Sequence, residues 1–339
     1  MYICLTISRS KRLAWEVMKR VSKMIRCAIA VLVSGCAHPG VGAGRDSIAD
    51  EFIGTTPGDA LAREFVGGLK ADAPCHSITW QIKLATNRTS GLPTTFSLAA
   101  SYHVPTKSNP NRSEDGPKVK FNGIWDTSKA EGTNPKAVVY RLNTEKPRRS
   151  LSFVKVGDNL LQLLNPDGSM AVGNGGQSYT LNRANRAEKP GDSVAAMNAP
   201  SMSYKISALA TGATVFAVFE GRTPCHGIAR ELNIPQHAGC IKSKWRVTLY
   251  QNPETSAPTT YKVEGSLFRD GAREGTWGMT RGATIDPNAT VYQLSPTQNQ
   301  SALLLLKGDE NVLFFLNHKR EPLVGHADFS YSLNRVGVK

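Results

Sequence analysis

Pro74-Cys75-His76-Ser77-Ile78 in the first half of the chain recurs as Pro224-Cys225-His226-Gly227-Ile228 in the second half. Each copy follows a Phe-x-Gly triplet, at residues 65–67 and at residues 219–221. These two stretches open a longer series of shared landmarks, and that series decides how the chain is divided.

The landmarks follow both copies in the same order. Pro-Thr-Thr begins thirteen positions after Trp80 and thirteen positions after Trp245. A Gly-x-Trp triplet, a Val-Tyr-x-Leu stretch, a Gly-Asp pair and a closing Tyr-x-Leu-Asn-Arg then recur, at 123–125 and 275–277, 139–142 and 291–294, 157–158 and 308–309, and 179–183 and 331–335. Such an order, kept over more than a hundred residues, indicates an internal duplication.

The duplication predicts two domains in the 339-residue chain, at residues 61–183 and 206–339, each long enough to bury its own core. Residues 184–205 lack hydrophobic periodicity and are predicted to be a linker. Residues 36–60 are predicted to be a tether, with a helical turn or two within 59–65. Cys75 precedes Trp80 by five positions but Cys225 precedes Trp245 by twenty, which indicates an insertion in the second repeat.

Short β-strands are predicted within each copy. Residues 78–84 alternate between apolar and polar side chains, as expected of a half-buried strand. Further strands are expected at 95–102, 119–125, 137–142, 151–156, 160–164 and 177–183, separated by Gly, Asn, Asp and Pro. This spacing is typical of an antiparallel barrel or sandwich. The run Ala-Leu-Leu-Leu-Leu at 302–306 is apolar on both faces, so we expect the other domain to cover it.

The formal net charge of +14 is partly a property of the N-terminus. Without residues 1–35 the chain has 34 basic and 26 acidic residues, a net charge of +8. The excess is spread through loops, whereas a nucleic-acid interface needs a clustered basic face with aromatic platforms. We therefore predict no nucleic-acid partner.

Residues 1–35 are predicted to hold a lipoprotein signal peptide and an upstream segment. Residues 18–26 are basic, and the apolar run 27–33 that follows is far shorter than a membrane span. Val33-Ser34-Gly35-Cys36 then resembles the processing site at which bacterial lipoproteins are cleaved and acylated. We expect Cys36 to carry an acyl anchor in the outer membrane, with the domains in the periplasm or at the cell surface.

The chain resembles the N-terminal domain of the NlpE family, whose members are copper-resistance and envelope-stress lipoproteins. The resemblance is carried by the Phe-x-Gly, Pro-Cys, Gly-x-Trp and Tyr-x-Leu-x-Arg motifs. The resemblance covers nearly all of 61–183 and 206–336. It implies an all-β fold of two lipocalin-like small antiparallel β-barrels in tandem, and a partner in an envelope-stress sensor. The sequence departs from the family's Cys-x-x-Cys in both copies, and the family's second, OB-like domain has no visible counterpart here.

The cysteines of an exported protein meet an oxidising compartment, so pairing is expected. Cys240 lies five positions before Trp245, as Cys75 lies before Trp80, while Cys225 shares the neighbours of Cys75. We predict that a Cys225–Cys240 disulfide closes the inserted loop, worth about 3 kcal/mol in the chain-entropy model. Cys75 is then left over, and it is buried and inert, bonded to another cysteine, or a reactive or metal-binding group.

A functional interpretation of these cysteines is a Cu(I) site, because thiolate and imidazole are suitable ligands for that ion. Its candidate ligands are Cys75, His76, Cys225 and His226, with His237 in the inserted loop and Met197 and Met202 in the linker. Neighbouring residues on a strand point to opposite faces, so the site would have to bridge two facing copies. Purely structural roles for these residues are the alternative, with no cofactor bound.

No motif for an enzyme is present: there is no Gly-x-Ser-x-Gly, His-Glu-x-x-His or phosphate-binding glycine loop. The recurring tryptophans either pack the cores or line a cavity for an apolar ligand. The prediction is a non-enzymatic outer-membrane lipoprotein of NlpE type that binds a partner in envelope-stress, surface or copper sensing. A carrier of a small apolar ligand and a structural or inhibitory envelope lipoprotein are the alternatives.

Overall fold

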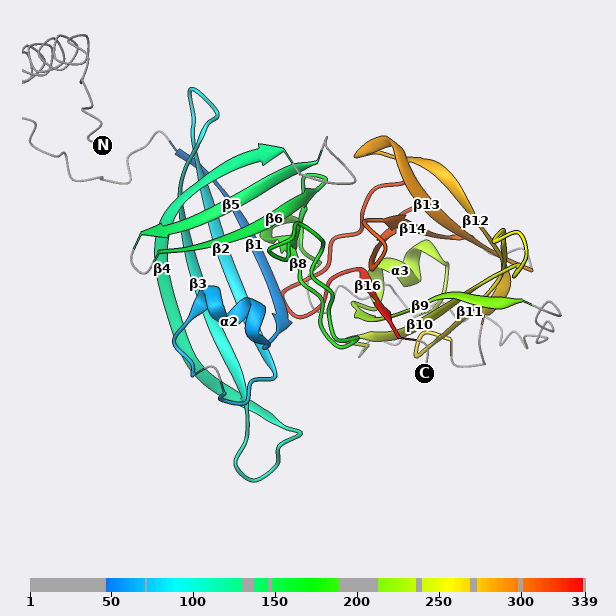
Figure 1. Ribbon diagram of the computed structural model, residues 1–339, viewed down its shortest axis with the longest axis horizontal. Coiled ribbons are helices and arrows are strands. Elements are labelled where there is room, and N and C mark those ends of the chain that lie inside the picture. The colour runs from blue at the N-terminus through cyan, green and yellow to red at the C-terminus, as the bar shows by residue number, and fades with distance from the viewer. Residues whose placement is uncertain are drawn as a thin grey trace, which may run out of the picture. The chain divides into compact units, whose positions relative to one another are not determined.

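The computed structural model describes residues 47–70, 72–129, 137–145, 148–188, 213–235, 240–268, 273–297 and 301–337. It consists of two closed antiparallel barrels of eight strands each, in tandem (Figure 1). This confirms the predicted fold class. The signal peptide, Cys36, His237, Met197 and Met202 lie outside the described residues.

The first barrel closes by pairing its first strand with its last, at Phe52 against Arg183. Its strands follow one another in chain order around the barrel. They are β1 (Ser47–Pro57), β2 (Ser77–Asn87), β3 (Pro93–Pro105), β4 (Ser113–Lys129), β5 (Val138–Glu145), β6 (Arg148–Val156), β7 (Leu160–Leu163) and β8 (Thr180–Arg183), followed by a 3₁₀ turn η1 (Ala184–Arg186).

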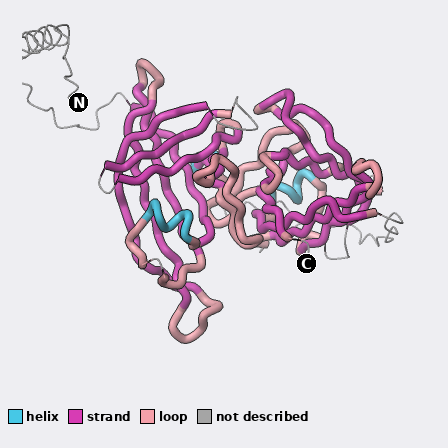
Figure 2. The backbone as a smooth tube through the Cα atoms, in the orientation of Figure 1, coloured by secondary structure: helices cyan, strands magenta, loops and turns pink. Residues whose placement is uncertain are grey.

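The second barrel repeats this order and closes at Phe219 of its first strand against Arg335 of its last. Its strands are β9 (Thr214–Thr223), β10 (Ser243–Gln251), β11 (Pro258–Gly265), β12 (Arg273–Ala283), β13 (Asp286–Pro296), β14 (Leu303–Lys307), β15 (Val312–Leu316) and β16 (Ser332–Val336). Besides the strands and η1, the described regular structure is one short α-helix in each half of the chain, drawn in cyan in Figure 2.

The first barrel begins earlier than predicted. Residues 47–57, which the sequence assigns to the tether, form β1 and pair with β2 along their whole length. Phe52 is the only large apolar side chain of β1 that is buried, and the other buried positions alternating with it are Gly54 and Thr56. Because small residues fill the inward positions, the strand has almost no hydrophobic periodicity.

This strand also corrects the alignment of the two copies. Gly54 pairs with Trp80, and Gly221 pairs with Trp245. The Phe-x-Gly of residues 219–221 therefore corresponds to residues 52–54, whereas residues 65–67 lie at the end of a helix.

The indole hydrogen bonds give the same register. Trp80 donates to the hydroxyl of Thr56 and Trp245 to that of Thr223, each at 2.8 Å. The separations along the chain are 24 and 22 residues, so the second repeat carries no insertion.

A short helix closes one end of each barrel after its first strand. These are α2 (Ala60–Val66) and α3 (His226–Glu231). Phe65 and Val66 of α2 are buried in the first core, and Ile228 and Ala229 of α3 in the second. The helices therefore act as apolar plugs, which is why segments with little strand character lie between paired strands.

Each barrel interior is filled by its own side chains. All four recurring tryptophans are buried in these cores, with exposed fractions of 1–7% (Trp80, Trp125, Trp245 and Trp277). The second tryptophan of each barrel also donates a hydrogen bond to a backbone carbonyl near the end of that barrel's second strand. Trp125 donates to Ala85, and Trp277 donates to Tyr250. An eight-stranded barrel is just wide enough for such a filling.

A third apolar core joins the two barrels through their outer faces. It contains Val154 and Leu160 from the first barrel and Leu306 and Phe314 from the second. Alternate residues of the leucine run face opposite ways, because Leu303 and Leu305 belong to the interior core. Residues 302–306 are thus covered on both faces as predicted, but the other barrel covers only one of them, and the interior of their own barrel covers the other.

Candidate functional site

The predicted disulfide is present. Cys225 and Cys240 are bonded, with their Cα atoms 6.0 Å apart. Cys225 lies directly before α3, and Cys240 lies just before β10. The bridge therefore ties the helical plug to the strand that follows it. It closes a segment that both barrels possess rather than an insertion.

Cys75 occupies the position of Cys240 in the first barrel. Its thiol lies 3.4 Å from the carbonyl oxygen of Ser77, two residues on, as the Sγ of Cys240 lies 3.8 Å from that of Lys242. The residue at the place of Cys225 is Gly58, and a Cβ built there would overlap the Sγ of Cys75. The first barrel thus holds one half of the bridge that the second barrel completes.

The environment of Cys75 favours a thiol of low reactivity. It is a free cysteine with partial burial, and burial raises the pKa of the thiol above its usual value. A raised pKa lowers the thiolate fraction that nucleophilic attack and metal binding require. Of the three interpretations left open by the sequence, the partial burial and the raised pKa favour a mainly structural cysteine.

The structure does not assemble the predicted copper site. Cys225 is consumed by its disulfide and cannot offer a thiolate. His76 bonds Ser113 through Nδ1 at 2.6 Å, and His226 is buried at the start of α3. Within the part of the chain that the structure describes, no group of three or more His, Cys, Asp or Glu side chains could hold a metal ion.

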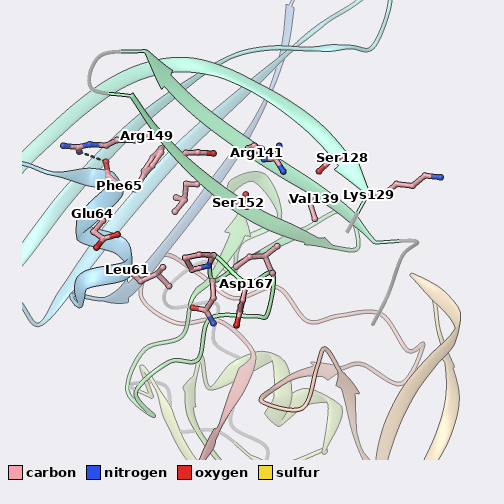
Figure 3. A pocket seen from close by; sticks show the side chains of 16 residues that line it. Leu61, Glu64, Phe65, Ser128, Lys129, Val139, Arg141, Arg149, Ser152 and Asp167 are labelled. Atoms are coloured by element: carbon pink, nitrogen blue, oxygen red, sulfur yellow. Dashed lines mark hydrogen bonds between the residues drawn. The ribbon is translucent and has the colours of Figure 1, made fainter. Parts of the chain in front are cut away.

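A groove on the first barrel is one recess that can take a ligand (Figure 3). It measures about 510 Å³ and lies between α2, the outer side of β5 and β6, and the turn that follows β7. Its apolar lining includes Leu61, Val139 and Leu164. Recesses of this size can accept a small molecule or a few side chains of a protein partner.

Charged side chains surround this groove. Arg149 donates a hydrogen bond to the carbonyl oxygen of Phe65 at 2.7 Å and so ties β6 to α2. Arg141 projects from β5, is exposed, and forms no ion pair with another described residue. Glu64 and Asp167 stand across from it in Figure 3, so the groove presents both charges.

The aspartate of the groove is held in place by its own turn. The Asp167 carboxylate accepts hydrogen bonds from the backbone N–H and the hydroxyl of Ser169, at 2.9 and 2.6 Å. These bonds lower the pKa of Asp167, so it stays ionised. Together with Arg141, for which no ion pair is found within the described part of the chain, it makes the groove suited to polar recognition of a protein surface.

A buried polar cluster lies near α3 in the second barrel. The Tyr331 hydroxyl donates to Glu188 at 2.6 Å and accepts from the backbone N–H of Gly227 at 2.8 Å. Burial raises the pKa of Tyr331 well above its usual value, so this phenol remains a donor. The cluster ties the segment leaving the first barrel to the helical plug of the second.

Sequence reasoning missed both of these features. The groove combines α2, β5, β6 and a turn, none of which carries a distinctive motif. Tyr331 belongs to the repeated Tyr-x-Leu-Asn-Arg, and this repetition indicates a structural role for the tyrosine. Glu188 lies in the segment predicted to be a linker, where no sequence pattern indicates a partner for Tyr331.

Comparisons with protein-family models, with curated proteins and with solved structures find no match for this chain. Among the described residues, no helix is both long and apolar enough to cross a membrane. The site geometry is therefore the basis for any functional conclusion.

Proposed function

We propose that this chain is a lipid-anchored envelope protein of the bacterial outer membrane that binds a protein partner on the outer surface of its barrels and catalyses no reaction. The observation that carries the proposal is the filling of both barrel interiors by their own aromatic and aliphatic side chains. A carrier of a small apolar ligand needs an open interior, so the packing argues against that alternative.

The groove of the first barrel is the proposed contact for the partner. Its apolar lining is combined with an exposed cation at Arg141 and a fixed anion at Asp167. Interfaces of regulatory proteins combine a buried apolar centre with a charged rim in this way. By its resemblance to NlpE-type lipoproteins, we place the partner in envelope-stress sensing.

The test follows an envelope-stress reporter in bacterial cells that produce the full chain. Wild type is expected to raise the reporter signal, and Cys36→Ser to abolish the rise by removing the anchor. Arg141→Glu reverses the charge of an exposed side chain and should weaken the signal at unchanged protein level. Gln293→Glu, at the same repeat position in the second barrel, is the matched control and should behave as wild type.

Two results would overturn the proposal. Equal signals from Arg141→Glu and wild type would remove the groove as the contact. Saturable binding of a fluorescent fatty acid by the purified chain, competed by unlabelled fatty acid, would show that an interior opens and would favour the carrier.

A further inference from the structure

The turn between the second and third strands has the same backbone in both barrels. In the first barrel the Asn87 side chain accepts from the backbone N–H groups of residues 89 and 90. In the second, Asn252 accepts from those of residues 254 and 255. The fifth position has a positive φ in both, 68° at Gly91 and 56° at Ser256. The duplication therefore supplies two copies of one turn.

The surfaces of these two turns differ. Leu92 is 63% exposed in the first barrel, and the corresponding residue in the second is Ala257. Arg88 corresponds to Pro253, and Thr89 to Glu254. With the backbone the same, the first turn is apolar and cationic, and the second is small and acidic.

Two further exposed apolar side chains lie at the same end of the first barrel. Ile48 is 52% exposed and pairs with Thr86, next to the turn; Ile124 is 55% exposed and pairs with Thr95, just after it. Counted from the shared Phe and Trp landmarks, their counterparts in the second barrel are Val215 and Thr276. We call Ile48, Arg88, Leu92 and Ile124 the apolar rim.

This rim lies where the chain enters the barrel. Figure 1 shows the start of β1 and the β2–β3 turn at one end of the first barrel, and Ser47 pairs with Asn87 there. Cys36 precedes Ser47 by 11 positions, a span of at most about 40 Å even when fully extended. Because the chain joins the barrel at this end, an anchor at Cys36 holds the apolar rim within about 40 Å of the bilayer surface.

We propose that the apolar rim is a membrane-contacting surface that orients the first barrel on the bilayer. Leu92, Ile48 and Ile124 enter the headgroup region, and Arg88 pairs with lipid phosphates. Shallow insertion of apolar side chains next to a cation is how peripheral proteins hold a bilayer surface. The inference rests on the proposed lipid anchor for its geometry, but its chemistry can be tested without that anchor.

The test places one environment-sensitive dye on the full acylated chain in vesicles of phosphatidylethanolamine and phosphatidylglycerol. The dye is attached at Leu92→Cys or, as the matched control, at Ala257→Cys, both in a Cys75→Ser background. We expect the emission at position 92 to shift to the blue and to be quenched by brominated acyl chains, with neither effect at position 257. Equal behaviour at the two positions would overturn the proposal.

A second arm separates this inference from the lipid anchor. The chain from residue 37 onward, held on vesicles through an N-terminal histidine tag and nickel-chelating lipid, should give the same contrast between positions 92 and 257. If Cys36 proves not to be acylated but the contrast persists, the proposed anchor fails and the rim stands. If Cys36 is acylated and the contrast is absent, the rim alone fails.

A third measurement uses no dye. The untagged chain from residue 37 onward should bind the same vesicles weakly, and Leu92→Ala should lower that affinity about tenfold, because one exposed leucine no longer leaves water. Because Leu92 is largely exposed, this change leaves the fold intact. An unchanged affinity would contradict insertion of Leu92.

Discussion

Asn182 and Asn334 occupy the same position in the two barrels, and each reaches across to hydrogen-bond the other barrel. Asn182 donates to the carbonyl oxygen of His326 at 3.1 Å and accepts from the N–H of Gly325 at 2.8 Å. Asn334 accepts from the N–H of Gly173 at 2.7 Å. Both side chains are buried, with exposed fractions of 0% and 1%.

The exchange follows an approximate two-fold relationship. Ser178 and Ser330, which are also repeat equivalents, bond each other at 2.6 Å at its centre. A two-fold interface uses the same surface on both partners, as homodimers do. The two barrels therefore pack as a dimer of similar units joined in one chain.

The first prediction concerns this interface. Asn182→Ala should lower the free energy of unfolding by about 1–3 kcal/mol, because it leaves a buried N–H and a buried carbonyl without partners. Asn334→Ala should act in the same direction. Urea denaturation measures both. Asn143→Ala removes an exposed bond to Asp126 and is the control, with little expected change. Equal effects of Asn182→Ala and Asn143→Ala would contradict the buried exchange.

The second prediction restores the missing bridge of the first barrel. Gly58→Cys should form a disulfide with Cys75 under oxidising conditions, adding up to about 3 kcal/mol in the chain-entropy model. The gain will be reduced because a Cβ at residue 58 lies 2.8 Å from the carbonyl oxygen of Cys75, so the backbone must shift slightly. Non-reducing peptide mass spectrometry and denaturation with and without reductant measure the two effects.

Gly58→Ala is the control for that experiment. It brings the same steric conflict without the bridge and should destabilise the first barrel by about 1–3 kcal/mol. If Gly58→Cys remains unbridged after oxidation, the two positions are not equivalent to Cys225 and Cys240.

The third prediction concerns the existing disulfide. Cys225→Ser together with Cys240→Ser should cost about 2–4 kcal/mol, since the closed loop then gains freedom in the unfolded state. Hydrogen exchange should increase in α3 and the approach to β10, while α2 keeps its protection. Uniform loss of protection in both barrels would show instead that the bridge supports the shared interface.

The fourth prediction concerns the single thiol. Among the cysteines of the described residues, only Cys75 should react with iodoacetamide in the oxidised chain, and slowly, because burial raises the pKa of its thiol. The rate should still be rising with pH above the usual thiol range. Added Cu(I) should not protect it. Strong protection by Cu(I) would return copper to consideration.

The fifth prediction is a pH dependence from His326. Burial lowers the pKa of this ring below 6.5, despite the opposing effect of Asp328 and Glu188. On acidification the unfolded chain therefore takes up this proton first, and stability falls from about pH 6.5 downward until the folded ring is protonated as well. His326→Asn, whose side-chain oxygen can still accept from Asp328, should flatten this slope between about pH 7 and pH 5. An unchanged slope would exclude His326 as the cause.

The periodic strands could be predicted because their side chains alternate strongly. Residues 78–84 place Ile78, Trp80, Ile82 and Leu84 on one face, and the structure buries all four. β1 could not be found in this way, since Gly54 and Thr56 fill its inward positions and carry no apolar signal. Missing β1 then led the Phe-x-Gly of residues 65–67 to be matched with the wrong strand.

The cysteines show a similar division. Local sequence matched Pro-Cys-His at residues 74–76 with residues 224–226, but the distance to the tryptophan matched Cys75 with Cys240. The structure shows that Cys75 corresponds to Cys240, as the distance to the tryptophan indicates. Burial of one face fixes the register of a strand, whereas residues in the neighbouring loops are not constrained in this way.

By itself, the sequence determined the duplication, the strand-rich fold, the Cys225–Cys240 bridge and the need to cover the leucine strand on both sides. These follow from periodicity, spacing and composition, which are local properties of the chain. Only the tertiary structure decided that the interiors are filled, that Gly58 faces Cys75, and that Asn182 and Asn334 exchange hydrogen bonds between barrels. Those relationships depend on residues far apart in the sequence, brought together by barrel closure and by the burial of a shared apolar face.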